Sequence, residues 1–304
     1  MQTWTEDLIP DQHGRRAVVT GANSGVGRVT AMELARHGAA VVLAVRDVAA
    51  GEETAATIRR AAPDAEVEVR ALDLASLASI RAFAEDLTGP LDLLVNNAGV
   101  ALTGARPPLT VDGFDPQMGT NALGPYALTG LLLDRLTAGR EPRVVTVSSI
   151  VHRWRGLDLD DLMSERSYTG PRAYSLSKLV ATILGLELDR RLRAAGSPVI
   201  SVLAHPGMTH TNLTPRALAN RNALLRAVGR LNPLLVSPVR EGARPQLCAA
   251  TAPGVRGGQF FGPRGFREIR GPVTEVRASA PARDPGNGRR MWARAARLTG
   301  VTYL

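Results

Sequence analysis

Thr20-Gly21-Ala22-Asn23-Ser24-Gly25-Val26-Gly27 follows a short β-branched run and precedes a helical stretch that begins near Arg28. Glycines in such a turn permit positive φ angles and let a phosphate group approach the free amides of the helix N-terminus. The spacing is GxxxGxG and not GxGxxG, which is the commonest dinucleotide fingerprint. The turn favours a nucleotide-binding site, although a glycine-rich turn after a strand can also be only a turn.

On either side of this turn, the chain alternates short apolar runs with longer helical stretches, which is the pattern of βαβ units around a parallel sheet. The predicted strands are Ala17–Thr20, Ala40–Val45, Val67–Leu72, Leu91–Val95, Val144–Ser148, Val199–Ala204 and Gln259–Phe261. We therefore expect an α/β fold: a single-domain, Rossmann-like doubly wound sheet of about seven parallel strands with helices on both faces. Ligands of such sheets bind at the carboxyl ends of the strands.

The chain of 304 residues suits one α/β domain with appended ends. The Rossmann-like domain is predicted over residues 15–262, with a substrate-loop region at about 208–238. Residues 1–14 are predicted as an N-terminal extension. Residues 263–304 are predicted as a C-terminal extension with a short helix around Arg289–Leu298.

Composition argues against several classes of protein. The net charge is +9, but the basic residues are spread evenly and only 4% of residues are aromatic, so no nucleic-acid partner is expected. No apolar run reaches the roughly 20 residues that a membrane span needs, and the N-terminus lacks the apolar core of a signal peptide. A cytoplasmic location without a membrane span is expected. The single cysteine, Cys248, is expected to be a small buried hydrophobe, and no metal site is predicted.

Lys178 is the only lysine among 37 basic residues, and it lies four residues after Tyr174. Both side chains therefore project from one face of a helix. A phenol with a pKa near 10 is a poor acid–base catalyst at neutral pH, and lowering that pKa by about 3 requires roughly 4 kcal/mol of stabilisation of the phenolate. We expect a neighbouring ammonium to contribute to this stabilisation. A surface Tyr/Lys pair is common, but this pair also follows Ser148-Ser149, which ends a predicted strand.

Taken together, these motifs resemble the short-chain dehydrogenase/reductase family. The glycine turn matches every fixed position of the family's TGxxxGxG motif, and residues 96–99 match its NNAG motif. The resemblance implies a catalytic tetrad of Asn121, Ser149, Tyr174 and Lys178. In the family, the tyrosine transfers the proton and the serine bonds the substrate oxygen. The lysine aids the tyrosine and holds the nicotinamide ribose, and the asparagine anchors a water in the proton relay.

The resemblance also implies NADP(H) as the cofactor. The cofactor-binding residues that it implies are Gly21, Asn23, Ser24, Gly25, Val26, Gly27, Arg46, Asp73, Leu74, Asn97, Ala98, Gly99, Tyr174, Lys178, Pro206, Gly207, Thr209 and Thr211. NAD-selective members carry an acid at the position of Val45, whereas NADP enzymes use an arginine for the 2′-phosphate. Here Val45 is apolar and Arg46 comes next, while Asp47 is expected to cap the following helix. These residues favour NADP(H).

Trp4-Thr5, Ile9-Pro10, His205-Pro206-Gly207 and residues 258–263 (GQFFGP) resemble the branch that contains retinol dehydrogenases and WW-domain oxidoreductases, here without WW modules. This resemblance implies hydride transfer between the nicotinamide and a carbonyl/alcohol pair, with NADPH reducing a lipophilic or natural-product-like substrate. It also implies a homodimer or homotetramer. An apolar pocket is predicted from Val151, Trp154, Leu157, Met163, Met208, Leu213 and Leu218.

Two other functions are compatible with a Rossmann-type turn. A nucleotide-sensing regulatory protein would keep the turn without turnover, but a sensor needs no proton relay. A sugar-nucleotide epimerase or dehydratase has a different glycine spacing, TGxxGxxG, and usually has a larger C-terminal domain than residues 205–304 supply.

A third possibility is that His205 and His210 bind a metal or activate a serine. This role is disfavoured because no carboxylate lies at ligand spacing from them in the sequence.

Overall fold

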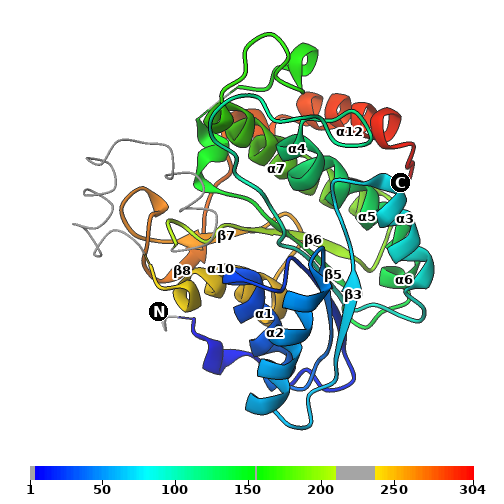
Figure 1. The fold of residues 1–304 in the computed structure, drawn as a ribbon. Coiled ribbons are helices and arrows are strands. Elements are labelled where there is room, and N and C mark those ends of the chain that lie inside the picture. Colours follow the sequence, from blue (N-terminus) through cyan, green and yellow to red (C-terminus); the bar gives the residue numbers. More distant parts are fainter. Residues whose placement is uncertain (1–3, 155, 210–236) are drawn as a thin grey trace.

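The computed structural model describes residues 4–154, 156–209 and 237–304. They form one sheet in the order β3-β2-β1-β4-β5-β6-β7-β8, with helices against both faces (Figure 1). The strands are β1 (Arg16–Thr20), β2 (Ala40–Val45), β3 (Val67–Ala71), β4 (Leu93–Asn96), β5 (Arg143–Val147), β6 (Ile200–Ala204), β7 (Phe260–Pro263) and β8 (Val273–Glu275). The predicted Rossmann-like α/β fold is confirmed.

The helices form a layer on each side of the sheet, with α1, α2 and α10 on one face and α3 to α7 with α12 on the other (Figure 1). Their bounds are α1 (Gly25–Arg36), α2 (Val48–Ala61), α3 (Leu77–Asp86), α4 (Pro116–Met118), α5 (Gly124–Leu131), α6 (Leu133–Thr137), α7 (Gly170–Ala194), α10 (Val239–Thr251), α11 (Ala280–Arg283) and α12 (Pro285–Thr299). Short 3₁₀ turns span η1 (Glu6–Leu8), η3 (Ile150–Arg153), η4 (Leu159–Asp161) and η5 (Phe266–Glu268), and η2 (Gly119–Leu123) is a π-helical turn.

Each central strand contributes to two hydrophobic cores. In β1, Val18 packs into the core on the α5 and α7 side, whereas Ala17 and Val19 pack into the core on the α1 and α10 side. Successive side chains of a strand point to opposite faces, so a strand covered on both faces needs an unbroken apolar run. This requirement explains why the strands are visible in the sequence as continuous β-branched stretches.

Strands β1 to β7 are the predicted parallel strands, whereas the sequence did not predict what lies at the edge of the sheet beyond β7. An eighth strand, β8, pairs antiparallel with β7, with Phe261 opposite Glu275 and Pro263 opposite Val273. The other pairs are parallel. The strand has only three residues and follows Gly271-Pro272, so it carries no alternating pattern long enough to predict it. It forms because the chain turns back after β7.

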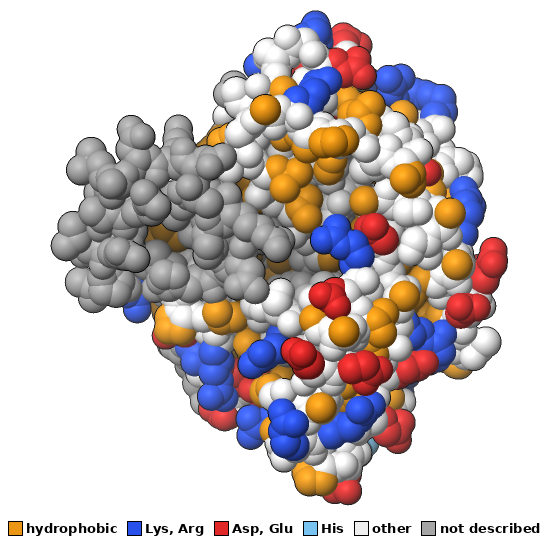
Figure 2. All heavy atoms as spheres, in the orientation of Figure 1, with side chains coloured by type: hydrophobic (Ala, Val, Ile, Leu, Met, Phe, Trp, Pro, Cys, Tyr) orange, Lys and Arg blue, Asp and Glu red, His pale blue; other side chains and the backbone are white. Residues whose placement is uncertain are grey.

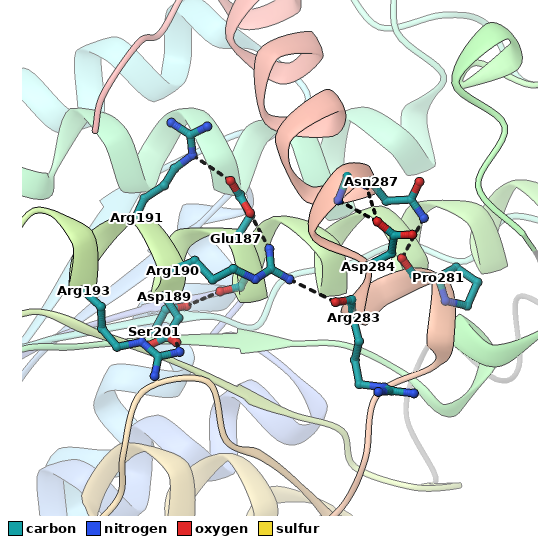
Figure 3. A network of polar contacts seen from close by, with 12 residues as sticks. Glu187, Asp189, Arg190, Arg191, Arg193, Ser201, Pro281, Arg283, Asp284 and Asn287 are labelled. Atoms are coloured by element: carbon teal, nitrogen blue, oxygen red, sulfur yellow. Dashed lines mark hydrogen bonds and ion pairs between the residues drawn. The ribbon is translucent and has the colours of Figure 1, made fainter.

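The C-terminal helix α12 packs against α7 (Figure 1). Its Trp292 is buried, with its ring centroid 4.9 Å from that of Tyr126, and the guanidinium of Arg191 lies 4.8 Å above the indole ring. Figure 3 shows the polar contacts beside this packing: the carboxylate of Glu187 accepts from Arg190 and Arg191, and Arg190 also donates to the carbonyl of Arg283. Residues 263–304 therefore supply a strand to the sheet and a helix to its core.

The chain before β1 is tied to α10. The buried carboxylate of Glu6 accepts from Nε of Arg240 at 2.5 Å and from Nε of Arg244 at 2.9 Å. On the same helix, the thiol of Cys248 is buried as predicted, and burial raises its pKa to about 12. Among the described helices, none combines the length and apolarity needed to cross a membrane. Basic and acidic side chains are interspersed on the face seen in Figure 2.

Candidate active site

The glycine turn after β1 packs directly against the segment that follows β4. Gly21 and Gly25 have φ angles of +65° and +54°, in the region that favours glycine. A Cβ on Gly27 would lie 2.3 Å from Nδ2 of Asn97, and one on Gly21 would lie 3.0 Å from Cα of Ala98. The TGxxxGxG and NNAG motifs are therefore parts of one packed unit, in which neither glycine can carry a side chain without movement.

Thr20 joins the same two segments by hydrogen bonds. Its hydroxyl accepts from the backbone N–H of Asn97 at 3.0 Å and of Ala98 at 2.9 Å, and Nδ2 of Asn97 donates to the Thr20 carbonyl at 2.8 Å. Ser24, the residue before α1, makes no side-chain hydrogen bond to the start of that helix. The N-terminal amides of α1 are thus not capped by this residue, as an anion-binding helix start requires.

The end of β2 separates a buried residue from an exposed charge. Val45 is 1% exposed and packs in the hydrophobic core, whereas Arg46 is exposed. Asp47 accepts from the N–H of Ala50 at 3.1 Å and so caps α2, as predicted. Within the described part of the chain, Arg46 forms no hydrogen bond or ion pair. Its guanidinium is therefore available to a ligand at this edge of the sheet.

The segment after β3 holds Asp73 and Leu74, two of the predicted cofactor-binding residues. Asp73 accepts from the N–H of Ala75 at 2.9 Å, so its side chain shapes the local turn. Leu74 is buried, and a Cβ on Gly124 would lie 2.4 Å from its carbonyl oxygen. The segment therefore packs tightly against the start of α5.

Tyr174 and Lys178 lie on α7, which Thr169 caps by accepting from the N–H of Arg172. Tyr174 is half-buried, and its phenol forms a hydrogen bond with the side chain of Ser149. Ser149 lies two residues after the end of β5. Burial raises the pKa of Tyr174, and the bond with Ser149 offsets only part of this rise. The structure therefore does not show the lowered pKa that the sequence suggested, because burial outweighs the other effects.

Lys178 is buried on the same face of α7. Its Nζ donates to the carbonyl oxygen of Val147 at 2.9 Å, and burial lowers its pKa to about 8. A Cβ on Gly99 would lie 3.3 Å from this nitrogen, so the glycine of the NNAG motif lets the segment after β4 approach the ammonium closely. Ser148, the serine not chosen from the sequence, instead bonds Thr182 at 2.6 Å and is buried.

Asn121 lies in the π-helical turn Gly119–Leu123, a distortion often found at functional sites. Its Nδ2 donates to Oγ of Ser177 and to the carbonyl of Val100, both at 2.9 Å, and its Oδ1 accepts from the N–H of Val100 at 2.8 Å. Asn121 therefore connects the segment after β4 with the helix that carries Tyr174 and Lys178.

The segment after β6 adds a backbone turn to this edge. Gly207 has a φ of +67°, and the hydroxyl of Thr209 donates to the carbonyl of Pro206 at 2.8 Å. Met208 and Trp154 are exposed, at 47% and 66%, while Leu157 and Met163 pack against the core. Thr211, Leu213 and Leu218 lie outside the described residues.

Sequence reasoning did not single out Thr20, His152 or Glu268 as site residues. Thr20 is the first residue of the TGxxxGxG motif, so a signal for it was present. The carbonyl of Ser149 accepts from Nδ1 of His152 at 2.7 Å, and Glu268 contacts His205 at 2.9 Å across 63 residues of sequence. No local pattern could have indicated either contact. Within residues 4–154, 156–209 and 237–304, no group of three or more His, Cys, Asp or Glu side chains could hold a metal ion.

Similarity to known proteins agrees with this geometry. A family model described as short chain dehydrogenase matches residues 15–222. The mouse protein "Polyprenol dehydrogenase" is 42% identical over 302 residues, which cover 97% of this chain and 86% of that protein. Human "Retinol dehydrogenase 12" is 37% identical, covering 95% of this chain and 88% of that protein.

Among solved structures, an uncharacterised protein from Mycobacterium paratuberculosis has a TM-score of 0.83 and 42% identity, and the match covers 100% of both chains. The RhlG/NADP active-site complex from Pseudomonas aeruginosa has a TM-score of 0.64 and 27% identity, covering 82% of this chain and 94% of that one. The motifs, the fold and these similarities establish that the chain belongs to the short-chain dehydrogenase/reductase family of oxidoreductases.

Proposed function

We propose that the protein is an NADP(H)-dependent oxidoreductase that transfers a hydride between the nicotinamide and a lipophilic carbonyl/alcohol pair, with NADPH as the reductant. One observation carries the proposal above all others. The phenol of Tyr174 on α7 forms a hydrogen bond with the side chain of Ser149 after β5, and the buried Lys178 lies one turn further along α7. A substrate oxygen placed beside them would meet two hydroxyl donors.

The residues present fit a dinucleotide. The glycine turn opens onto the N-terminus of α1, which favours the pyrophosphate, and the Lys178 ammonium lies next to Gly99 of the NNAG motif, where it would bind a ribose. Arg46 would pair with the 2′-phosphate in a charge-assisted contact, since the buried Val45 offers no acceptor to a ribose diol. When bound, NADPH supplies the hydride.

The chain's own residues then handle the substrate oxygen and its proton. Because burial raises the pKa of Tyr174, the phenol is protonated at neutral pH and can act as the general acid. Ser149 would donate a second hydrogen bond and so stabilise the charge that develops on the oxygen. Lys178 would hold the ribose and favour the phenolate after the proton has left.

Two features support a lipophilic substrate. The similar proteins from mouse and human are named for a polyprenol and a retinol. In addition, Trp154 and Met208, which extend the segments after β5 and β6, present exposed apolar surface. An apolar site binds hydrocarbon groups well, whereas a small acid would need a convergent cationic partner.

The test is NADPH consumption by the purified protein with a panel of carbonyl compounds. Aromatic and long-chain ketones and aldehydes should be reduced, and pyruvate should be a poor substrate. Efficient reduction of pyruvate alone would refute the lipophilic assignment. Tight NADPH binding without turnover of any carbonyl would instead favour a nucleotide-sensing protein.

A further inference from the structure

Glu268 lies in the hairpin between β7 and β8 and contacts the segments that follow two other strands. Its Oε2 lies 2.9 Å from Nε2 of His205, directly after β6. The same carboxylate accepts from Nη2 of Arg153, in η3 after β5, at 2.8 and 3.1 Å. We call this set of three residues the Glu268 clasp. The carboxylate partner that the sequence near His205 lacks is thus supplied by the fold.

His205 is fully buried and its hydrogen bonds assign its tautomer. Nδ1 accepts from the N–H of Gly207 at 3.2 Å, so Nε2 carries the hydrogen and donates to Glu268. The ring fits because residue 262 is a glycine, whose Cβ would lie 2.2 Å from Nε2. The imidazole therefore fixes the backbone of the Pro206-Gly207 turn on one side and binds Glu268 on the other.

Arg153 connects the clasp with the turn that begins at Ser149. It is the last residue of η3, for which Ser149 is the N-cap. In the same turn, Nδ1 of His152 donates to the Ser149 carbonyl, while its Nε2 accepts from the N–H of Ser279 at 3.2 Å. Nη2 of Arg153 also donates to the carbonyl of Arg277 at 2.5 Å, so the β7–β8 hairpin and the residues just after it hold this turn at three points.

The hairpin backbone is shaped for this contact. Arg267 and Glu268 have φ angles of 50° and 59°, a left-handed conformation that costs energy for residues other than glycine. The carbonyl of Ile269 accepts from the N–H of Met208 at 2.8 Å, and a Cβ on Gly207 would lie 2.3 Å from that carbonyl oxygen. The hairpin thus packs against the backbone of the turn after β6.

The charge on Glu268 is maintained. Burial raises the pKa of its carboxyl, but hydrogen bonds from His205 and Arg153 more than offset this, and the pKa lies below its ordinary value. At neutral pH the carboxylate is ionised and accepts from both partners.

We propose that Glu268 is a positioning residue that sets the Pro206-Gly207 turn against the Ser149 turn, and so aligns the nicotinamide end of the cofactor with the hydroxyls that bind the substrate oxygen. This inference rests on the proposed function. Glu268 would act through its contacts with His205 and Arg153 and not by touching the hydride or the substrate. Its effect is confined to the nicotinamide half of the site, because β1 and β2, which carry the adenosine half, are separated from β6 by β4 and β5.

Glu268→Ala should lower kcat by roughly 10- to 100-fold, since small misalignments of reacting groups cost about this much. Glu268→Gln keeps an acceptor for His205 but weakens the contact with Arg153, so its loss should be smaller. Glu275→Gln is the matched control: Glu275 lies in the same hairpin and accepts from Gln259 at 2.8 Å. This control should keep wild-type turnover.

Two further readouts separate positioning from general damage to the fold. Binding of adenosine 2′,5′-bisphosphate, which probes only the adenosine half, should be unchanged in both Glu268 variants, whereas NADPH binding should weaken. The kinetic isotope effect with NADPH deuterated at the transferred position should rise, because misalignment slows the hydride step. If Glu268→Ala does not fold, Glu268→Gln and Arg153→Gln provide the same comparison.

Wild-type turnover in Glu268→Ala would overturn the proposal. Equal weakening of NADPH and of adenosine 2′,5′-bisphosphate would also overturn it, since the residue would then support the whole fold. If the wild-type protein reduces no carbonyl, the proposed function fails, but the ratio of the affinities for NADPH and adenosine 2′,5′-bisphosphate still tests the positioning role of Glu268. A changed ratio in Glu268→Ala supports this role, and an unchanged ratio refutes it.

Discussion

The two halves of the candidate site are built by opposite means. The adenosine half, at β1 and β2, consists of glycines, backbone amides and one exposed guanidinium, that of Arg46. The nicotinamide half, at β5 and β6, consists of polar side chains in or next to the protein interior, among them Tyr174, Lys178 and His205. Each of these side chains has a hydrogen-bond partner within the protein.

This difference predicts how each half responds to substitution. Water weakens the contact of an exposed charge with a ligand, so such a charge can be exchanged at small cost. A buried polar group has already lost its water, so removing it or its partner leaves another group unsatisfied. Changes in the nicotinamide half should therefore have the larger effects.

The largest effect is expected for Tyr174→Phe, which removes the proposed proton donor and leaves the ring. Turnover should fall by about 10² to 10⁴, the usual range for loss of a general acid, while NADPH still binds. Tyr168→Phe is a matched control, since that phenol accepts from Gln117 at 3.3 Å in the neighbouring loop. The measurement is kcat with a verified substrate, and turnover retained in Tyr174→Phe would disprove the assignment of the acid.

A second prediction concerns the stability of the nicotinamide half. Burial lowers the pKa of His152 from 6.5 to about 4. Between these values the unfolded chain binds a proton that the folded chain does not. The contribution of neutral His152 to the free energy of unfolding is therefore fully present above about pH 6.5 and is lost as the pH falls towards 4. The difference between the two pKa values corresponds to about 3 kcal/mol.

The free energy of unfolding in urea should therefore decrease with falling pH across this interval more steeply in the wild type than in His152→Gln. Parallel curves for the two proteins would show that His152 is not the group that titrates.

The smallest effect is expected in the adenosine half. Charge-assisted hydrogen bonds of about 1.5 to 3 kcal/mol between Arg46 and the 2′-phosphate imply a preference for NADPH over NADH of about 10- to 100-fold. Val45→Asp combined with Arg46→Ser should reverse it, because a carboxylate accepts from the ribose diol and repels the phosphate.

The measurement is the ratio of kcat/KM with the two cofactors at one ionic strength, since salt screens exposed charges. Arg60→Ser, an exposed arginine of α2 that bonds Thr57, serves as the control. A wild-type ratio at or below one would mean that Arg46 does not bind the phosphate.

Much of the molecule could be predicted from the sequence, because the deciding signals are local. The glycine turn depends on backbone freedom at positions a few residues apart, and the Tyr174–Lys178 pair depends only on helix periodicity. The central strands are predictable because burial on both faces demands continuous apolar runs. The ends of strands are harder to predict: the strand predicted from Leu91 begins at Leu93, and the side chain of Asp92, just before it, accepts from the N–H of Arg16 at 2.6 Å.

Only the tertiary structure decided how the polar groups meet. The partner of His205 is Glu268, and that of His152 is Ser279, 127 residues away. The pKa of Tyr174 and the strand β8 likewise depend on what packs around them. Sequence periodicity reports which face of an element is buried, but not which other element covers it. The helices, the central strands and the family motifs are therefore determined by local patterns in the sequence. The burial of polar side chains, their hydrogen-bond partners and the edges of the sheet follow from contacts between distant segments.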